Sequence, residues 1–201
     1  MRRAPLFAAL LLAAGAAAAD EPERLDPDWP CVQRKVPALT PAAIWTGPAI
    51  DGVEDWAADP EVARLVGRLS QRRVPMETAE AEIAAFAEAT PPERRAERLT
   101  ALFAGLFEVM DAERGEIIEG VERFARRQKA LAERIRAQFA GLEAAPPGSA
   151  EATEAQARMD WDRRIFEERR QSTSYICEVP RLVEQRLFAL GRAIAEATPD
   201  G

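Results

Sequence analysis

The chain has 201 residues, with 34 acidic and 27 basic side chains, no histidine and a net charge of −7 at neutral pH. An acidic chain repels phosphate backbones and anionic lipid headgroups, so nucleic acid and membrane surfaces are disfavoured as partners. Without histidine the chain lacks the commonest proton-transfer group of enzymes and every histidine-containing zinc or copper site. We therefore expect no catalytic residues and no cofactor.

Residues 1–19 have the pattern of a secretory signal peptide. Arg2 and Arg3 precede the apolar stretch 6–12, and Ala17 to Ala19 form an A-x-A cleavage signal before Asp20. The apolar stretch is too short and too rich in alanine to span a bilayer. Cleavage after Ala19 predicts a periplasmic or secreted protein without stable membrane insertion, and it removes two of the 27 basic residues to leave a net charge of −9.

Residues 20–58, here called the arm, are rich in proline and hold three of the four tryptophans, Trp29, Trp45 and Trp56. Proline interrupts helices, while large aromatic residues are unusual in a disordered tail. The composition predicts an extended, ordered arm with one short helix after Thr40. Together with Trp161, these tryptophans are candidates for a partner surface, or alternatively they cap one end of a helical bundle.

An acidic run, Asp51, Glu54, Asp55 and Asp59, lies at the end of the arm. Clustered carboxylates are the ligands that calcium and similar cations prefer, which makes these four residues a candidate metal site. The spacing does not match an EF-hand loop. The alternative is a solvated acidic turn before a capped helix.

Residues 59–198 have helical periodicity and are expected to form one helical domain. Asp59 followed by Pro60 predicts a capped helix start, a second short helix is expected over 77–89, and Thr90 with Pro91 repeats the cap-and-proline pattern. The next helix carries apolar residues from 99 to 110, and Gly105 within it would allow close helix contact.

The strongest pattern predicts a long helical hairpin, about 111–145 and 149–197. The start near 111 is poorly marked, so the first helix either begins there or runs on from the preceding helix with a kink. Apolar residues and glutamines recur at spacings of 4 and 3, which is typical of a coiled-coil seam: Ile117, Val121, Phe124, Gln128, Leu131, Ile135, Gln138 and Leu142. The prolines and glycine at 146–148 predict a loop, so the two helices should be antiparallel neighbours. Pro180 predicts a kink or a break near Cys177 to Glu178.

The second candidate site is the charged stretch from Asp160 to Arg164, which includes Trp161 and Asp162. Asp162 and Arg169 both fall on the seam of the second long helix. They are expected either to set the register as a buried charged pair or to lie on an exposed part of the seam. A third reading is that the seam opens there into a polar ligand pocket facing Gln128.

The two cysteines, Cys31 and Cys177, both follow the signal peptide. An even number of cysteines in an oxidising compartment predicts a disulfide bond. The long separation and the lack of a C-x-x-C spacing favour a structural role over a redox role.

These patterns predict an all-α protein, namely an elongated antiparallel helical hairpin with a coiled-coil-like seam and an extended arm rich in proline and tryptophan. The leading hypothesis is an exported, non-enzymatic interaction protein that binds a protein partner in the bacterial envelope, as an accessory subunit or adaptor. The alternatives are an ATP-independent periplasmic chaperone and a carboxylate-based metal-binding protein. The outer face of the hairpin also offers a surface for a homo-oligomer.

Overall fold

The computed structural model describes residues 26–53 and 55–198. The expected signal peptide at 1–19 therefore lies outside the described residues. Two short 3-10 turns, η1 (Pro41–Ala43) and η2 (Trp56–Ala58), precede four helices, which are α1 (Pro60–Leu69), α2 (Met76–Ala89), α3 (Pro92–Ala144) and α4 (Ala150–Ala197). The described part of the chain contains no strand, and the predicted all-α fold is confirmed.

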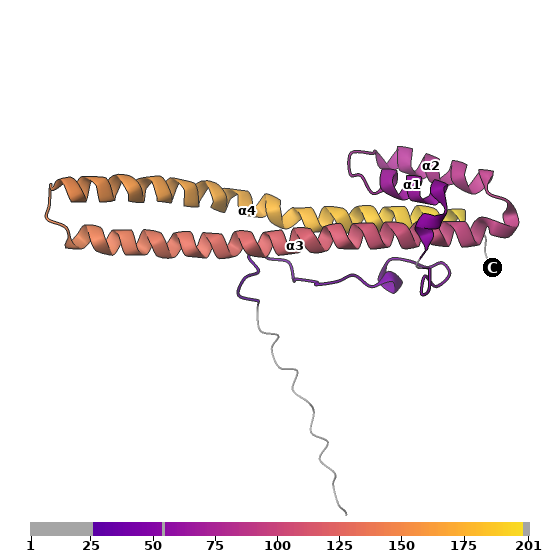
Figure 1. Cartoon of the computed structure of the whole chain (residues 1–201), viewed down its shortest axis with the longest axis horizontal. Helices are drawn as coiled ribbons and strands as arrows, with labels where there is room; N and C mark the ends of the chain where they lie inside the picture. The colour runs from indigo at the N-terminus through magenta and orange to yellow at the C-terminus, as the bar shows by residue number, and fades with distance from the viewer. Residues whose placement is uncertain (1–25, 54, 199–201) are drawn as a thin grey trace, which may run out of the picture.

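The long helices α3 and α4 form an elongated antiparallel hairpin (Figure 1). The loop between them contains Gly148 with a φ of 77°, a left-handed conformation that glycine adopts without a steric penalty. Ser149 then caps α4, since its hydroxyl oxygen accepts a hydrogen bond from the backbone N–H of Ala152 at 3.1 Å. The sequence signals for this loop and the next helix start are thus confirmed.

One predicted boundary is wrong, and two alternatives at other positions are resolved. The first long helix has no start near 111, because α3 is continuous through this position. Thr90 does not cap α3; it follows the last residue of α2, and its hydroxyl donates to the carbonyl oxygen of Phe86 at 2.7 Å. The alternative of a break near Cys177 is excluded, because α4 stays helical through Pro180. Proline has no N–H to offer Ile176, and Figure 1 shows that the path of α4 bends in this region.

Helices α1 and α2 cover one end of the hairpin, with α1 against α3 and α2 against α4. We call residues 92–118 and 177–197 of the hairpin the proximal half, and residues 119–144 and 150–176 the distal half. The core lies in the proximal half and under α1 and α2, where these side chains are almost completely buried: Val62, Leu65, Leu69, Ile83, Leu99, Leu102, Phe103, Leu106, Met110, Val183, Leu187, Leu190 and Ile194.

Close helix contact at Gly105 is confirmed. A Cβ atom at this position would lie 2.7 Å from both Cδ2 of Trp56 and Cγ2 of Val66, which is too close for any side chain. The glycine therefore lets α1 and η2 approach the backbone of α3. Trp56 is also fixed by a hydrogen bond from its indole N–H to the carboxylate of Glu108 at 2.9 Å.

A buried arginine joins α4 to the loop between α1 and α2. Arg186 donates hydrogen bonds to the carbonyl oxygens of Leu69 and Val74 at 2.7–2.9 Å. Its burial lowers the pKa of the guanidinium from its ordinary value. Among the described residues, these two carbonyl oxygens accept no hydrogen bond from a helix N–H. The contact therefore provides hydrogen-bond partners both for the buried guanidinium and for the carbonyl oxygens.

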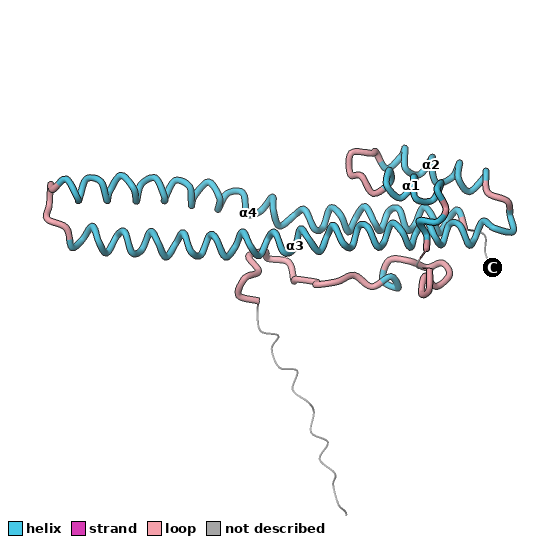
Figure 2. Tube along the Cα trace, in the orientation of Figure 1, coloured by secondary structure: helices cyan, strands magenta, loops and turns pink. Residues whose placement is uncertain are grey.

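The arm runs along the side of the hairpin opposite to α1 and α2 (Figures 1 and 2). The predicted disulfide between Cys31 and Cys177 is present and fastens the arm to α4. The buried Arg114 of α3 donates to the carbonyl oxygen of Val36 and to the carboxylate of Glu184, both at 2.6 Å. The expected short helix is present as η1, directly before the buried Trp45.

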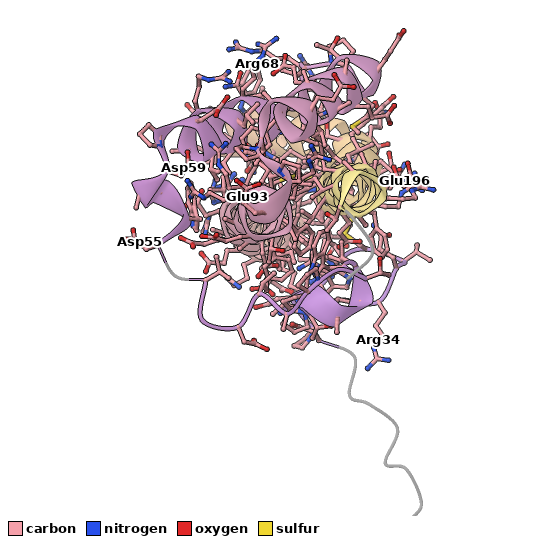
Figure 3. All side chains as sticks on the ribbon, turned by 90° about the vertical axis from the view of Figure 1, so that its right-hand side faces the viewer. Arg34, Asp55, Asp59, Arg68, Glu93 and Glu196 are labelled. Carbon is pink, nitrogen blue, oxygen red and sulfur yellow. A yellow bond between two sulfur atoms is a disulfide. The ribbon has the colours of Figure 1, made fainter. Side chains whose placement is uncertain are left out.

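Figure 3 looks along the hairpin from its proximal end and shows this three-layer arrangement. Arg68 lies on the outside of the layer formed by α1 and α2, and Arg34 lies on the arm at the opposite side. The proximal half is thus enclosed between two layers. Among the described residues, no helix combines the length and the apolar character needed to cross a membrane.

Candidate functional site

The tryptophans proposed as a partner surface do not form one patch. Trp45 is only 7% exposed and stacks on Phe103 with ring centroids 4.3 Å apart, which contradicts its expected place on a surface. Trp29 and Trp56 are half-buried, and the Trp29 indole donates to the carbonyl oxygen of Gln33 at 2.7 Å. These three tryptophans pin the arm, and Trp161 is the only one of the four that is largely exposed, at 59%.

The acidic run gains no support as a metal site. Asp59 caps α1 by accepting from the backbone N–H groups of Glu61 and Val62, and Arg98 binds both of its oxygens at 2.8 and 3.1 Å. The hydrogen bond from Arg98 lowers the pKa of Asp59. Asp51 and Asp55 are exposed, and Figure 3 shows Asp55 at the edge of the molecule, while Glu54 lies outside the described residues.

Within residues 26–53 and 55–198, no three acidic or cysteine side chains gather closely enough to hold a metal ion. A cavity of about 870 Å³ does lie beside Asp59 and Trp56, between the end of the arm and the start of α3. Two of its charged walls, Asp59 and Arg98, are bonded to each other. Metal binding by the acidic run therefore stays a prediction from the sequence alone.

Asp162 takes part in a polar cluster inside the distal seam. It is 7% exposed and accepts two hydrogen bonds from Arg134, at 2.7 and 2.8 Å, and one from Gln138 at 2.8 Å. The hydrogen bond from Arg134 lowers the pKa of Asp162. A charged pair at one seam position fixes how the two helices align, because any shift along the axis would leave the carboxylate without its partners.

The proposed pairing of Asp162 with Arg169 is wrong, since Arg169 is exposed. The partners of Asp162 are instead Arg134 and Gln138 on the facing helix. Gln128 is half-buried in the seam as expected, and its amide N–H donates to the carbonyl oxygen of Phe166 at 3.2 Å, which joins the two helices at that point. A ligand pocket facing Gln128 stays a prediction.

A groove of about 540 Å³ lies between α3 and α4 in the distal half, next to this cluster. It is lined by Ala132, Ile135, Arg136, Asp160, Arg163, Arg164, Phe166 and Glu167. Ile135 and Phe166 are seam residues that remain half-buried, so they form an apolar floor open to solvent. The charged side chains of both helices form the rim.

Positive charge on this rim is incompletely neutralised. Glu167 binds Arg170 at 2.7 Å, and Asp160 accepts from the amide of Gln156 at 3.0 Å. No carboxylate pairs with Arg163 or Arg164 among the described residues; the Arg164 guanidinium lies 5.7 Å from the ring of Trp161. The groove therefore combines an apolar floor with two arginines that are available to an external carboxylate.

Phe139 extends the apolar strip toward the tip of the hairpin. It lies four residues after Ile135 and seven after Ala132, which places all three on one face of α3. Phe139 is 52% exposed, and a large aromatic side chain that is exposed next to an apolar groove is typical of an interaction surface. The floor of the groove and Phe139 together form the candidate functional site, which we call the distal groove.

The rim of this site was visible in the sequence, but its floor was not. Asp160, Arg163 and Arg164 belong to the charged stretch already proposed as a pocket, whereas Ile135 was expected to be part of a closed seam. The available signal was Phe139, because it is a large apolar residue that does not fall on the predicted seam positions.

The chemistry of the distal groove suits binding. Hydroxyl groups in the neighbouring part of α4 are committed to the helix itself, as Ser172 and Thr173 donate to the carbonyl oxygens of Glu168 and Arg169. Comparison of the chain with family models, with curated proteins and with solved structures found no match.

Proposed function

We propose that this chain is an exported, non-enzymatic interaction protein, an accessory subunit or adaptor, that holds a protein partner on the distal half of its hairpin. The observation that carries the proposal is the contrast between two parts of the hairpin. The arm, α1 and α2 hold the proximal half as a base, whereas no other described element covers the distal groove, which lies beyond Lys129. The distal half contains 26 residues of α3 and 27 of α4, so it is roughly 40 Å long at 1.5 Å per residue.

Several features support a rigid base. The disulfide, the Arg114 contacts and the stack of Trp45 on Phe103 hold the arm against the proximal half. A base fixed in this way presents the distal groove in one orientation, which lowers the entropy cost of binding. The disulfide also fits a protein that works in an oxidising compartment, as the signal-peptide pattern predicts.

The proposal is tested by placing a photo-reactive amino acid at single positions of the full chain in living cells. Phe139 and Arg163 report on the distal groove, and the exposed Ala85 of α2 serves as the matched control on the base. We expect one dominant, stoichiometric crosslinked protein at both distal positions and none at Ala85.

Other outcomes are equally informative. A broad set of unrelated exported proteins at Phe139 would favour the chaperone hypothesis over the adaptor. The same crosslinks at Ala85 as at Phe139, or none at any position, would contradict a role for the distal groove in binding a partner.

A further inference from the structure

We infer that the distal groove binds an acidic amphipathic helix of the partner protein, which lies along α3 and α4 as a third helix. This inference rests on the proposed function and specifies the chemistry of the partner. It follows from the shape of the groove, from the way the arm covers the neighbouring part of the same helices, and from the distribution of charge.

The shape of the groove fits a helix. Two antiparallel helices leave a furrow along their seam, and a third helix with one apolar stripe can fill it. In the proximal half, residues of other elements fill that space; Trp45, for example, lies on Phe103. In the distal half Ile135 and Phe166 stay half-buried because no described residue covers them.

The arm already shows which charge this side of α3 attracts. Asp28 binds Arg126 and Lys129 of α3 at 3.2 and 2.9 Å, so a carboxylate of an extended segment sits on two basic side chains. The described arm begins two residues before Asp28, and the groove begins at Ala132, one helical turn beyond Lys129. An acidic ligand in the groove would continue the interaction that the arm starts.

The charge of the middle of the distal half points the same way. Residues 126–136 and 158–170 hold ten basic and five acidic side chains, although acidic residues exceed basic ones in the whole chain, 34 to 27. Arg163 and Arg164 lack carboxylate partners among the described residues. Glutamates flanking an apolar stripe would pair with these arginines while the stripe covers Ile135 and Phe166.

A direct test uses two synthetic helical peptides of about 20 residues, a length near six helical turns. Both carry leucine on one stripe, and they differ only in having glutamate or lysine at the flanking positions. Binding to the mature, oxidised protein is measured by fluorescence anisotropy. We expect the glutamate peptide to bind at least about tenfold more tightly than the lysine peptide, and its affinity to fall as salt rises.

Charge reversal locates the binding. Arg163→Glu combined with Arg164→Glu should weaken the glutamate peptide by about tenfold or more. Arg72→Glu combined with Arg73→Glu makes the same charge change at exposed positions between α1 and α2 and should leave the affinity unchanged. Circular dichroism confirms that both variants remain helical.

The inference is overturned if the lysine peptide binds equally well, or if reversal at 163 and 164 has no effect. It is also overturned if sedimentation shows that these arginines are needed for self-association, since a second copy would then occupy the groove. A crosslinked partner whose contacting segment is not an acidic helix would remove this inference and leave the proposed function standing. If the glutamate peptide binds but no partner is crosslinked in cells, the proposed function is contradicted, while the preference of the groove for an acidic helix stands.

Discussion

Both halves of the hairpin are built from α3 and α4, but they exclude water to very different degrees. In the proximal half Phe103, Leu106 and Leu187 are fully buried, whereas Phe124 and Phe166 in the distal half remain half-buried. The seam of the distal half buries smaller apolar side chains such as Leu131 and Met159, but it leaves these large aromatic residues partly exposed. Helices α1 and α2 cover only the proximal half, and the arm covers the proximal half and the beginning of the distal half, where Asp28 binds Arg126 and Lys129.

The largest expected effect is on the free energy of unfolding, when the same phenylalanine-to-alanine substitution is made in each half of the hairpin. Phe103→Ala should cost about 4 kcal/mol, because it removes a fully buried ring and its stack with Trp45. Phe166→Ala should cost about 1.5 kcal/mol, since its side chain is only partly removed from water. Urea unfolding followed by circular dichroism measures both, and equal losses would refute the contrast.

The disulfide is the next largest contribution. Replacing Cys31 and Cys177 with serine should lower the free energy of unfolding by about 3 kcal/mol, because the bond closes a long loop in the unfolded chain. The urea midpoint, measured with and without a reducing agent, tests this. Reductant should destabilise the natural chain and leave the double serine variant unaffected; an unchanged midpoint in the natural chain would show that the bond contributes nothing.

Replacing a glycine with alanine should change the stability in opposite directions in the two halves of the hairpin. Gly105→Ala should destabilise by about 2 kcal/mol, since the new Cβ would meet Trp56 and Val66 at 2.7 Å. Gly141→Ala in the distal half should stabilise by about 0.7 kcal/mol, because no atom lies within 4 Å of the new Cβ and alanine favours the helix. Thermal unfolding of both variants decides this, and the same sign for both would be the contrary result.

The smallest expected effect is the loss of stability at acidic pH that arises from Asp162. Arg134 lowers the pKa of Asp162 below the ordinary 3.8, so the folded state favours the charged carboxylate. Its stabilisation is present above the ordinary pKa and is lost as the pH falls through the lowered value. Asp162→Asn should therefore cost about 1 kcal/mol at pH 7 and flatten the loss of stability below pH 4.

The control for the acid effect is Asp160→Asn on the same helix. Asp160 is exposed, and among the described residues its one hydrogen-bond partner is the amide of Gln156, so its replacement should leave both the stability and its pH profile nearly unchanged. Melting temperatures of the three proteins between pH 7 and pH 2.5 provide the comparison. Identical profiles for the natural chain and Asp162→Asn would show that the cluster around Asp162 does not fix the seam.

The hairpin was predictable because its apolar residues recur at spacings of 4 and 3 from Ile117 to Leu142. The disulfide was predictable because the chain has two cysteines and an expected export signal. The sequence did not decide between a kink and a break of α4 at Pro180. The helix continues because the packing around the buried Pro180 outweighs the tendency of proline to interrupt a helix. Arg114 and Arg186 were also missed as buried anchors. Charged residues are normally exposed, and their carbonyl partners are distant in the sequence.

The candidate site shows the same division. Its charged rim was visible as a local run from Asp160 to Arg164, but its openness depends on where α1, α2 and the arm end along the hairpin. That endpoint follows from tertiary packing and has no local sequence signal. The burial of Trp45 was missed for the same reason, because its stacking partner Phe103 lies on another element.

The position of the disulfide also decides how tension would travel through the molecule. Cys31 and Cys177 are 146 residues apart, so the bond joins the arm directly to the last part of α4. A force applied between Asp26 and Thr198 would follow the arm to Cys31, cross the bond and continue along α4 from Cys177. The covalent path bypasses α1, α2, α3 and the first part of α4, so the distal groove lies outside the covalently loaded part of the chain.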